Sequence, residues 1–174
     1  MRIDLRVPPC KPANETADFI KQCEEAGFAG VGILDSQLLE RDVFVSMAIA
    51  AQATSKIRIA SAVTNPVTRH PSVLASAFKT VAEIAPGRTE YWMGRGYSSV
   101  QTIGIKPASV KQMRESVLTM KSLLAGDEVD FDGSKSRMRH GGGEVPPIYI
   151  SATGPRAIEA AGEVADGVLL QIGL

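Results

Sequence analysis

The chain has 174 residues, and its 19 basic side chains balance its 19 acidic ones. This balance provides no broad field to attract nucleic acid or an anionic membrane. No apolar stretch approaches the roughly 20 residues that cross a bilayer, and the N-terminus lacks the apolar core of a signal peptide. Cys10 and Cys23 form no CxxC pair and no zinc set. We therefore expect a cytoplasmic protein with reduced thiols, no metal and small-molecule partners.

The first half of the chain alternates short β-like runs with helical segments. In chain order we expect a strand at 3–7, a helix at 14–26, a strand at 30–35, a helix at 42–54, a strand at 57–63 and a helix at 70–85. Asn14 and Asp42 stand where helix N-caps belong. Phe19, Ile20 and Cys23 are expected on the buried face of the first helix.

The second half continues this alternation. We expect a strand at 89–94, a helix at 109–125, a strand at 147–151, a helix opening at Pro155 and a strand at 167–172. Ser109 and Gln112 have the spacing of a capping box, and Gly126 ends the helix that they begin. The polar stretch 126–146 is expected to be a surface excursion of a single domain that spans 1–174.

Six strands, most of them separated by one helix, are typical of an α/β protein with a parallel sheet. Both a doubly wound sheet and a (β/α)8 barrel produce this alternation. Periodicity alone does not decide between them.

Four segments resemble a known family, in the same order along the chain. They are GILDS at 32–36, AVTNPVTRHP at 62–71, MGRGYS at 93–98 and PPIYISATGPRAIEAAGEVADGVLL at 146–170. They resemble luciferase-like monooxygenases, particularly the deazaflavin-dependent methylenetetrahydromethanopterin reductase group. The resemblance implies a TIM-type (β/α)8 barrel that binds coenzyme F420 or FMN. It also implies an oxidoreductase that transfers a hydride to or from a small organic substrate.

Members of that family continue for two further β/α units, whereas this chain has about six and reaches Leu174. The expected fold is therefore an incomplete barrel. Its first and last strands would have unpaired edges, which favour a homodimer.

Other functions stay open at this point. An FMN-dependent monooxygenase that uses oxygen shares the same fold. A non-catalytic flavin-binding protein, or an inactive fragment, would bind the cofactor without turnover. A phosphate-binding barrel lyase or isomerase would need no redox cofactor.

The resemblance places the cofactor against the ends of the third and fifth expected strands. It implies a cis peptide between Ala62 and Val63 behind the flavin ring, with Thr64 and Asn65 hydrogen-bonding the ring's polar edge. Without the resemblance, Asn65 is an ordinary turn starter. For the cofactor phosphate it implies the helix start formed by Ser151, Thr153, Gly154, Pro155 and Arg156. Thr153 and Pro155 also suit a plain helix cap.

Gly94 and Gly96 are expected to leave room for the ring or its tail, although an ordinary tight turn also explains them. Asp35 is the acid–base candidate, against a capping or loop role. Two departures from the family accompany it. Ser36 stands where relatives often have histidine. Arg6 occupies roughly the position at which the methylene-reductase relatives have a functional glutamate. It cannot replace that glutamate as an acid, because arginine remains protonated.

Overall fold

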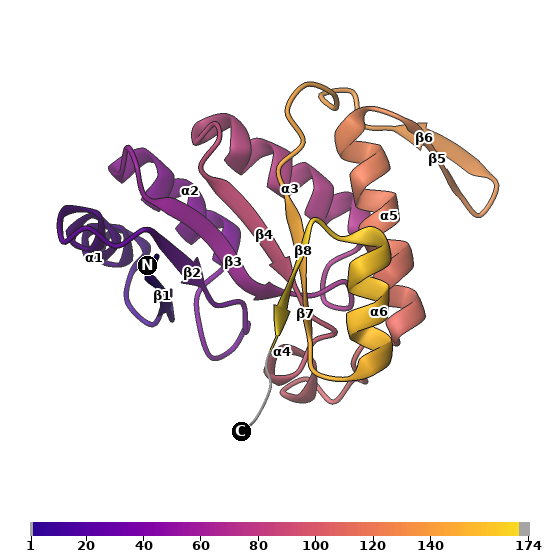
Figure 1. The fold of residues 1–174 in the computed structure, drawn as a ribbon, viewed down its shortest axis with the longest axis horizontal. Coiled ribbons are helices and arrows are strands. Elements are labelled where there is room, and N and C mark those ends of the chain that lie inside the picture. Colours follow the sequence, from indigo (N-terminus) through magenta and orange to yellow (C-terminus); the bar gives the residue numbers. More distant parts are fainter. Residues whose placement is uncertain (1, 171–174) are drawn as a thin grey trace.

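A six-stranded parallel sheet forms the centre of the molecule in a computed structural model that describes residues 2–170 (Figure 1). The strands, in their order across the sheet, are β1 (Asp4–Val7), β2 (Gly30–Ile33), β3 (Arg58–Thr64), β4 (Thr89–Met93), β7 (Ile148–Ala152) and β8 (Gly167–Leu170). Each strand pairs in parallel with the next. The expected incomplete TIM-type barrel is confirmed. The end of the last expected strand, residues 171–172, lies outside the described part.

Helices connect these strands, and the five long ones cover the outer face of the sheet (Figure 1). The helices are α1 (Ala13–Glu25), α2 (Val43–Ala53), α3 (Pro71–Ile84), α4 (Ser98–Gln101), α5 (Val110–Ala125) and α6 (Pro155–Val164). The long helices lie side by side in the order α1, α2, α3, α5, α6 (Figure 1). Across residues 2–170, none of the helices combines the length and apolar character needed to cross a membrane.

The hydrophobic core lies between the sheet and these helices. Ile20, Met47 and Met120 are fully buried there. The Tyr91 ring stacks on Phe78 with centroids 3.6 Å apart, and its hydroxyl donates a 2.6 Å hydrogen bond to the Phe78 carbonyl oxygen. Burial raises the pKa of Tyr91. The hydrogen bond to Phe78 satisfies the Tyr91 hydroxyl, which would otherwise be costly to bury.

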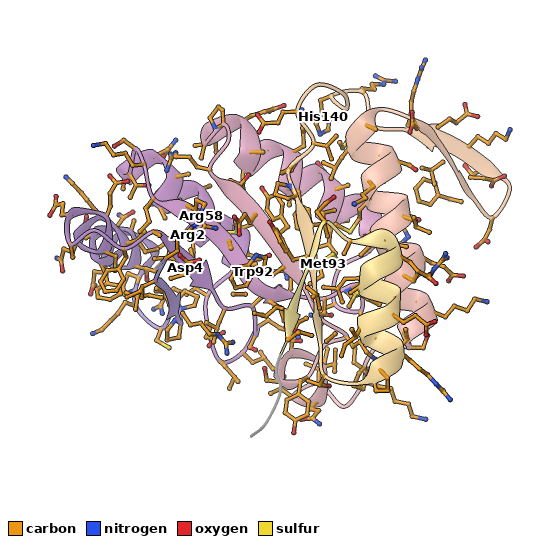
Figure 2. The ribbon with its side chains drawn as sticks, in the orientation of Figure 1. Arg2, Asp4, Arg58, Trp92, Met93 and His140 are labelled. Atoms are coloured by element: carbon orange, nitrogen blue, oxygen red, sulfur yellow. The ribbon has the colours of Figure 1, made fainter. Side chains whose placement is uncertain are left out.

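The inner face of the sheet carries an ion-pair network at the amino ends of the strands (Figure 2). Arg58 on β3 pairs with Glu90 on β4 and, at 2.8 Å, with Asp4 on β1. Gly30 on β2 stands in register between Asp4 and Arg58. A Cβ atom on Gly30 would lie 3.0 Å from an Asp4 carboxylate oxygen. The glycine therefore lets charges on non-adjacent strands meet across β2.

The first helix differs from its sequence-based prediction. It begins one residue earlier, because the Thr16 amide already bonds the Pro12 carbonyl oxygen, so Pro12 is the N-cap and Asn14 lies inside the helix. Phe19 is 48% exposed. The buried residues of α1 are Thr16, Ala17, Ile20 and Cys23, and Phe19 lies at the edge of this stripe.

The polar stretch 126–146 contains regular structure that the sequence did not indicate. An antiparallel hairpin, β5 (Glu128–Phe131) and β6 (Ser134–Arg137), projects beside α5 (Figure 1). Asp132 and Gly133 both have positive φ at its turn, as two-residue hairpins require. The stretch returns over α3, where the Lys79 ammonium donates a 2.7 Å bond to the Gly142 carbonyl.

The caps expected for α2 and α5 are confirmed. Asp42 accepts hydrogen bonds from the amides of Phe44 and Val45, and Ser109 and Gln112 form a reciprocal capping box.

We expect Ser109→Ala to lower the free energy of unfolding by about 1 kcal/mol, because the Gln112 amide loses its acceptor. Urea unfolding measures this loss. Ser122→Ala in the same helix is the matched control, and an equal loss there would contradict the capping role.

Candidate functional site

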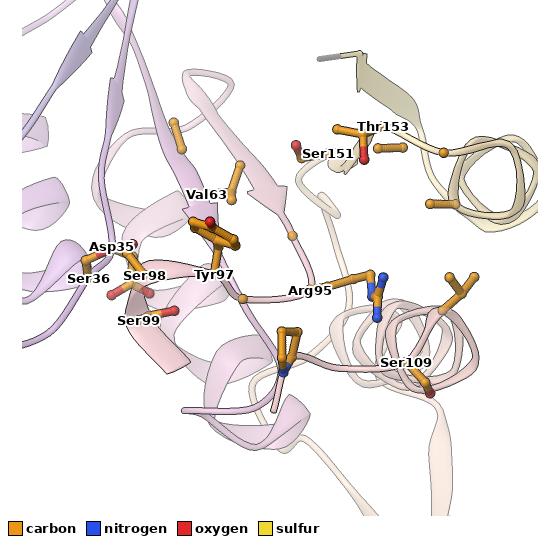
Figure 3. Close-up of a pocket in the computed structure, with 18 of the residues that line it drawn as sticks. Asp35, Ser36, Val63, Arg95, Tyr97, Ser98, Ser99, Ser109, Ser151 and Thr153 are labelled. Atoms are coloured by element: carbon orange, nitrogen blue, oxygen red, sulfur yellow. Dashed lines mark hydrogen bonds between the residues drawn. The ribbon is translucent and has the colours of Figure 1, made fainter. Parts of the chain in front are cut away.

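A pocket of about 1180 Å³ lies at the carboxyl ends of β1, β2, β3, β4 and β7 (Figure 3). In barrels of parallel strands this end carries the active site. The pocket brings together most of the residues singled out in the sequence. These are Asp35, Ala62, Val63, Gly94, Gly96, Ser151, Thr153, Gly154, Pro155 and Arg156. Thr64 and Asn65 are not among its lining residues.

The end of β3 forms the middle of the pocket. The peptide between Ala62 and Val63 is cis, as expected, and the strand's register shifts between Ala62 and Thr64. Val63 lies centrally in Figure 3, with Asp35 on one side and Ser151 on the other. A Cβ atom on Gly94 of the neighbouring strand would lie 2.8 Å from the Val63 side chain. Gly94 therefore makes room for Val63 itself.

Thr64 and Asn65 hold the loop that follows β3, and both are buried. The Thr64 hydroxyl donates a 2.7 Å bond to Asp35. The Asn65 amide donates to the Ser99 hydroxyl at 3.0 Å, and its oxygen accepts the amides of Val67 and Thr68. This is the turn role that the sequence also allowed for Asn65.

Arg69 connects three separate segments next to the pocket. Its guanidinium contacts the Asp35 carboxylate after β2 and, at 2.8 Å, the Asp42 carboxylate before α2. It also lies 5.1 Å from the centre of the Phe44 ring. Only 2% of the Asp35 side chain is exposed. The loop after β3 is thereby fixed to the end of β2 and the start of α2.

These contacts set the protonation of the two carboxyls. Burial raises the pKa of Asp35, and the attraction of Arg69 with the Thr64 hydrogen bond offsets part of that rise. Burial acts in the same direction at Asp42, but hydrogen bonds from the Val45 amide and from Arg69 outweigh it and lower the Asp42 pKa. Asp35 is therefore the carboxyl on the pocket that is easier to protonate.

The two departures from the family also line the pocket. Arg6 donates a 3.2 Å hydrogen bond to the Ala62 carbonyl, and the Ser36 hydroxyl bonds the Ser98 hydroxyl. Glu40, which the sequence analysis missed, lies close enough to interact electrostatically with both Asp35 and Arg6. Burial raises its pKa, and its Oε2 atom has no hydrogen-bond partner within residues 2–170.

The start of α6 forms the far side of the pocket. Gly154, not Thr153, is the N-cap, and no side chain caps the helix, so Thr153 does not fill the plain capping role. Pro155 occupies the first turn as expected. Thr153 and Arg156 are exposed, and a Cβ atom on Gly154 would meet nothing within 4 Å. An anion could therefore approach this helix start without obstruction.

The start of α5 is a side of the pocket that the sequence analysis did not foresee. Ser109, Val110 and Lys111 line it, together with Arg95 and Tyr97 from the loop after β4. Tyr97 is 75% exposed. The GRG segment was visible in the sequence, but no sequence signal placed the helix at 110–125 against this loop.

A half-barrel with a large pocket at the carboxyl ends of its strands defines a (β/α)-barrel protein of the ligand-binding or catalytic kind. A profile described as luciferase-like monooxygenase matches residues 2–173, and the chain belongs to this family.

Relatives and solved structures agree with this assignment. The chain is 33% identical over 177 residues to a 5,10-methylenetetrahydromethanopterin reductase of Methanolobus tindarius, covering 98% of this chain and 54% of that protein. An F420-dependent glucose-6-phosphate dehydrogenase of Beutenbergia cavernae is 33% identical over 135 residues, covering 71% of this chain and 40% of that protein. The structure of the coenzyme F420-dependent tetrahydromethanopterin reductase of Methanopyrus kandleri matches with a TM-score of 0.82 at 26% identity, over 98% of this chain and 55% of that one. The chain thus spans about half the length of these relatives.

We expect Arg69→Met to lower the free energy of unfolding at pH 7 by about 3 kcal/mol, because it leaves the Asp35 carboxylate buried and unpaired. Urea unfolding checks this loss. The double variant Asp35→Asn/Arg69→Met is the control, since it removes the buried charge as well, and it should recover part of the stability. A double variant as unstable as the sum of the two single variants would contradict the pairing.

The Arg69→Met deficit should also depend on pH. Without Arg69, the folded-state pKa of Asp35 rises further above its unfolded value. Below the unfolded pKa, about 4, both states hold the proton and the charge carries no penalty. As the pH rises, the folded state must keep the proton or bury a charge, so the deficit should grow between about pH 4 and pH 7. Unfolding curves that show a constant deficit would contradict this assignment.

Proposed function

We propose that this chain forms the cofactor-binding part of an oxidoreductase that uses coenzyme F420 or FMN. The proposed reaction is hydride transfer to or from a small organic substrate. The observation that carries the proposal is the single pocket shared by the bulged end of β3 and the uncapped start of α6. Its relatives include a 5,10-methylenetetrahydromethanopterin reductase and an F420-dependent glucose-6-phosphate dehydrogenase, which supports the same chemistry.

The lining residues fit such a cofactor. Ala62, Val63 and Gly94 offer an apolar surface with little bulk, which suits a flat ring. Ser151, Thr153 and Arg156 offer hydroxyl and guanidinium donors near a helix start, which suit a phosphate. The pocket therefore has a surface for each of the two chemical parts of a flavin nucleotide.

In this proposal the bound cofactor supplies the hydride chemistry, and the protein orients it. Val63 supports one face of the ring, while Ser151, Thr153 and Arg156 hold the phosphate. Thr64 and Asn65 act from behind the pocket wall, by fixing the loop on which Val63 stands.

Asp35 is the proposed acid–base residue. It lines the pocket, and burial raises its pKa, which brings a carboxyl closer to the range where it exchanges protons. Thr64 and Arg69 hold one of its oxygens in place. On this proposal Asp35→Asn retains the cofactor but loses turnover.

We also propose that the protein associates as a homodimer. β1 and β8 are the outermost strands of the described sheet, so each has one edge without a strand partner in residues 2–170. Such edges favour pairing with a further strand. Sedimentation of the purified chain tests this proposal, and a monomer at micromolar concentration would contradict it.

The phosphate site gives a sharper test of the proposed function. We expect Ser151→Ala/Thr153→Ala to raise the Kd of FMN about tenfold, because two donors to the phosphate are lost. Riboflavin, which has the ring but no phosphate, should keep its Kd within about twofold. Titration monitored by flavin fluorescence measures both, and coenzyme F420 is titrated in parallel.

Ser134→Ala/Ser136→Ala on the exposed strand β6 is the matched control and should change neither Kd. Equal weakening of FMN and riboflavin would contradict the phosphate role of α6. No spectral change with FMN or F420 would overturn the proposed function and favour a barrel enzyme without a redox cofactor. Binding of cofactor without turnover would instead indicate a flavin-binding protein.

A further inference from the structure

The charged side chains that line the pocket are mostly cationic. They are Arg6, Asp35, Arg95, Lys111 and Arg156. The one carboxylate among them, Asp35, is already paired with Arg69. The pocket is thus electropositive in a chain whose overall charge is balanced. An electropositive pocket concentrates anionic ligands.

Two of these cations, Arg95 and Lys111, form a side of the pocket that we call the α5 wall. The Arg95 Nε donates to the Ala108 carbonyl, and the Ala108 amide donates back to the Arg95 carbonyl at 2.8 Å. This pair of bonds fixes the loop after β4 to the start of α5. The guanidinium points toward α5, close to Ser109, in Figure 3. Its two terminal nitrogens have no protein partner within residues 2–170.

The Lys111 ammonium is also accessible to a ligand. Its side chain is 83% exposed, and its ion pair with Glu115 is 3.8 Å long. Exposed pairs one helical turn apart contribute little, so Glu115 does not hold the ammonium away from a ligand. Arg95 therefore presents two unpaired nitrogens within residues 2–170, and Lys111 presents an ammonium whose only pairing there is long and exposed.

The pocket also extends from the end of β3 to the starts of both α5 and α6. A phosphate at the start of α6 would engage Ser151, Thr153 and Arg156. The α5 wall then remains as a second cationic surface, reached from the same cavity.

We infer that the α5 wall is a binding site for carboxylates that extend beyond the cofactor phosphate. This inference rests on the proposed function and deepens it. FMN ends at its phosphate, whereas coenzyme F420 continues from its phosphate through a lactyl group into glutamates with free carboxylates. Arg95 and Lys111 match such a tail in charge. The wall selects F420 over FMN.

The test compares three ligands by fluorescence titration of the whole chain: F420, FMN and the F420 precursor that lacks both phosphate and tail. Arg95→Gln/Lys111→Gln should raise the Kd of F420 about tenfold and leave the Kd of FMN and of the precursor within about twofold. Added salt should weaken F420 more than the precursor. The charge-conserving variant Arg95→Lys/Lys111→Arg should keep most of the F420 affinity.

Lys135→Gln/Arg137→Gln on strand β6 removes the same two charges away from the pocket and should leave all three Kd values unchanged. Thermal unfolding of each variant verifies that it is folded. If the Gln variant binds F420 like the parent chain, or weakens all three ligands alike, the inference is wrong while the proposed function stands. If none of the three ligands binds the parent chain, the proposed function itself is wrong.

Discussion

The site depends on the guanidinium of Arg69, which joins the ends of β2 and β3 to the start of α2. Its two carboxylate partners, Asp35 and Asp42, belong to different segments, so one side chain fixes three backbone positions. Burying an unpaired carboxylate costs several kcal/mol, whereas a paired one with a further hydrogen bond is tolerated. The arginine therefore permits a carboxyl to stand on the pocket with a raised pKa and a fixed orientation. Thr64 completes this arrangement from β3, which links the orientation of Asp35 to the strand that carries Val63.

Small residues on the inner face let neighbouring strands pack closely beside this network. A Cβ atom on Gly32 would lie 2.6 Å from the Cβ of Ala62, and one on Gly94 would lie 2.8 Å from the Val63 side chain. A side chain at Gly32 would force β2 and β3 apart, whereas one at Gly94 would displace the Val63 side chain. The glycines are therefore required by contacts between strands, and the low bulk that suits a flat ring follows from the same contacts.

Much of the fold was predictable because local signals determined it. The short apolar strands, the capping box at Ser109 and the cap at Asp42 gave the order of elements that the structure shows. The features that were missed depend on tertiary contacts. Phe19 has helical spacing, but its exposure depends on how α1 turns against the sheet. The hairpin within 126–146 was missed because only β5 alternates polar and apolar residues, over four positions, while β6 is polar and exposed along its whole length. For the site, the sequence motifs predicted most of the residues that line the pocket. The inward position of Asn65 and the approach of α5 were not predictable, because they depend on loops whose path has no sequence periodicity.

The pocket divides into two regions with different physical properties. Around Val63 and Asp35 the Asp35 carboxylate is paired with Arg69 and Thr64, and Arg6 donates to the Ala62 carbonyl. Around α5 and α6 most donors are exposed, and the two terminal nitrogens of Arg95 lack protein partners in the described chain. Apolar contact and fixed geometry can orient a ring in the first region, while affinity for an anion must come mostly from the second. Because exposed charges act over a longer range than apolar contacts, the cationic region would meet a ligand first and guide its ring toward Val63.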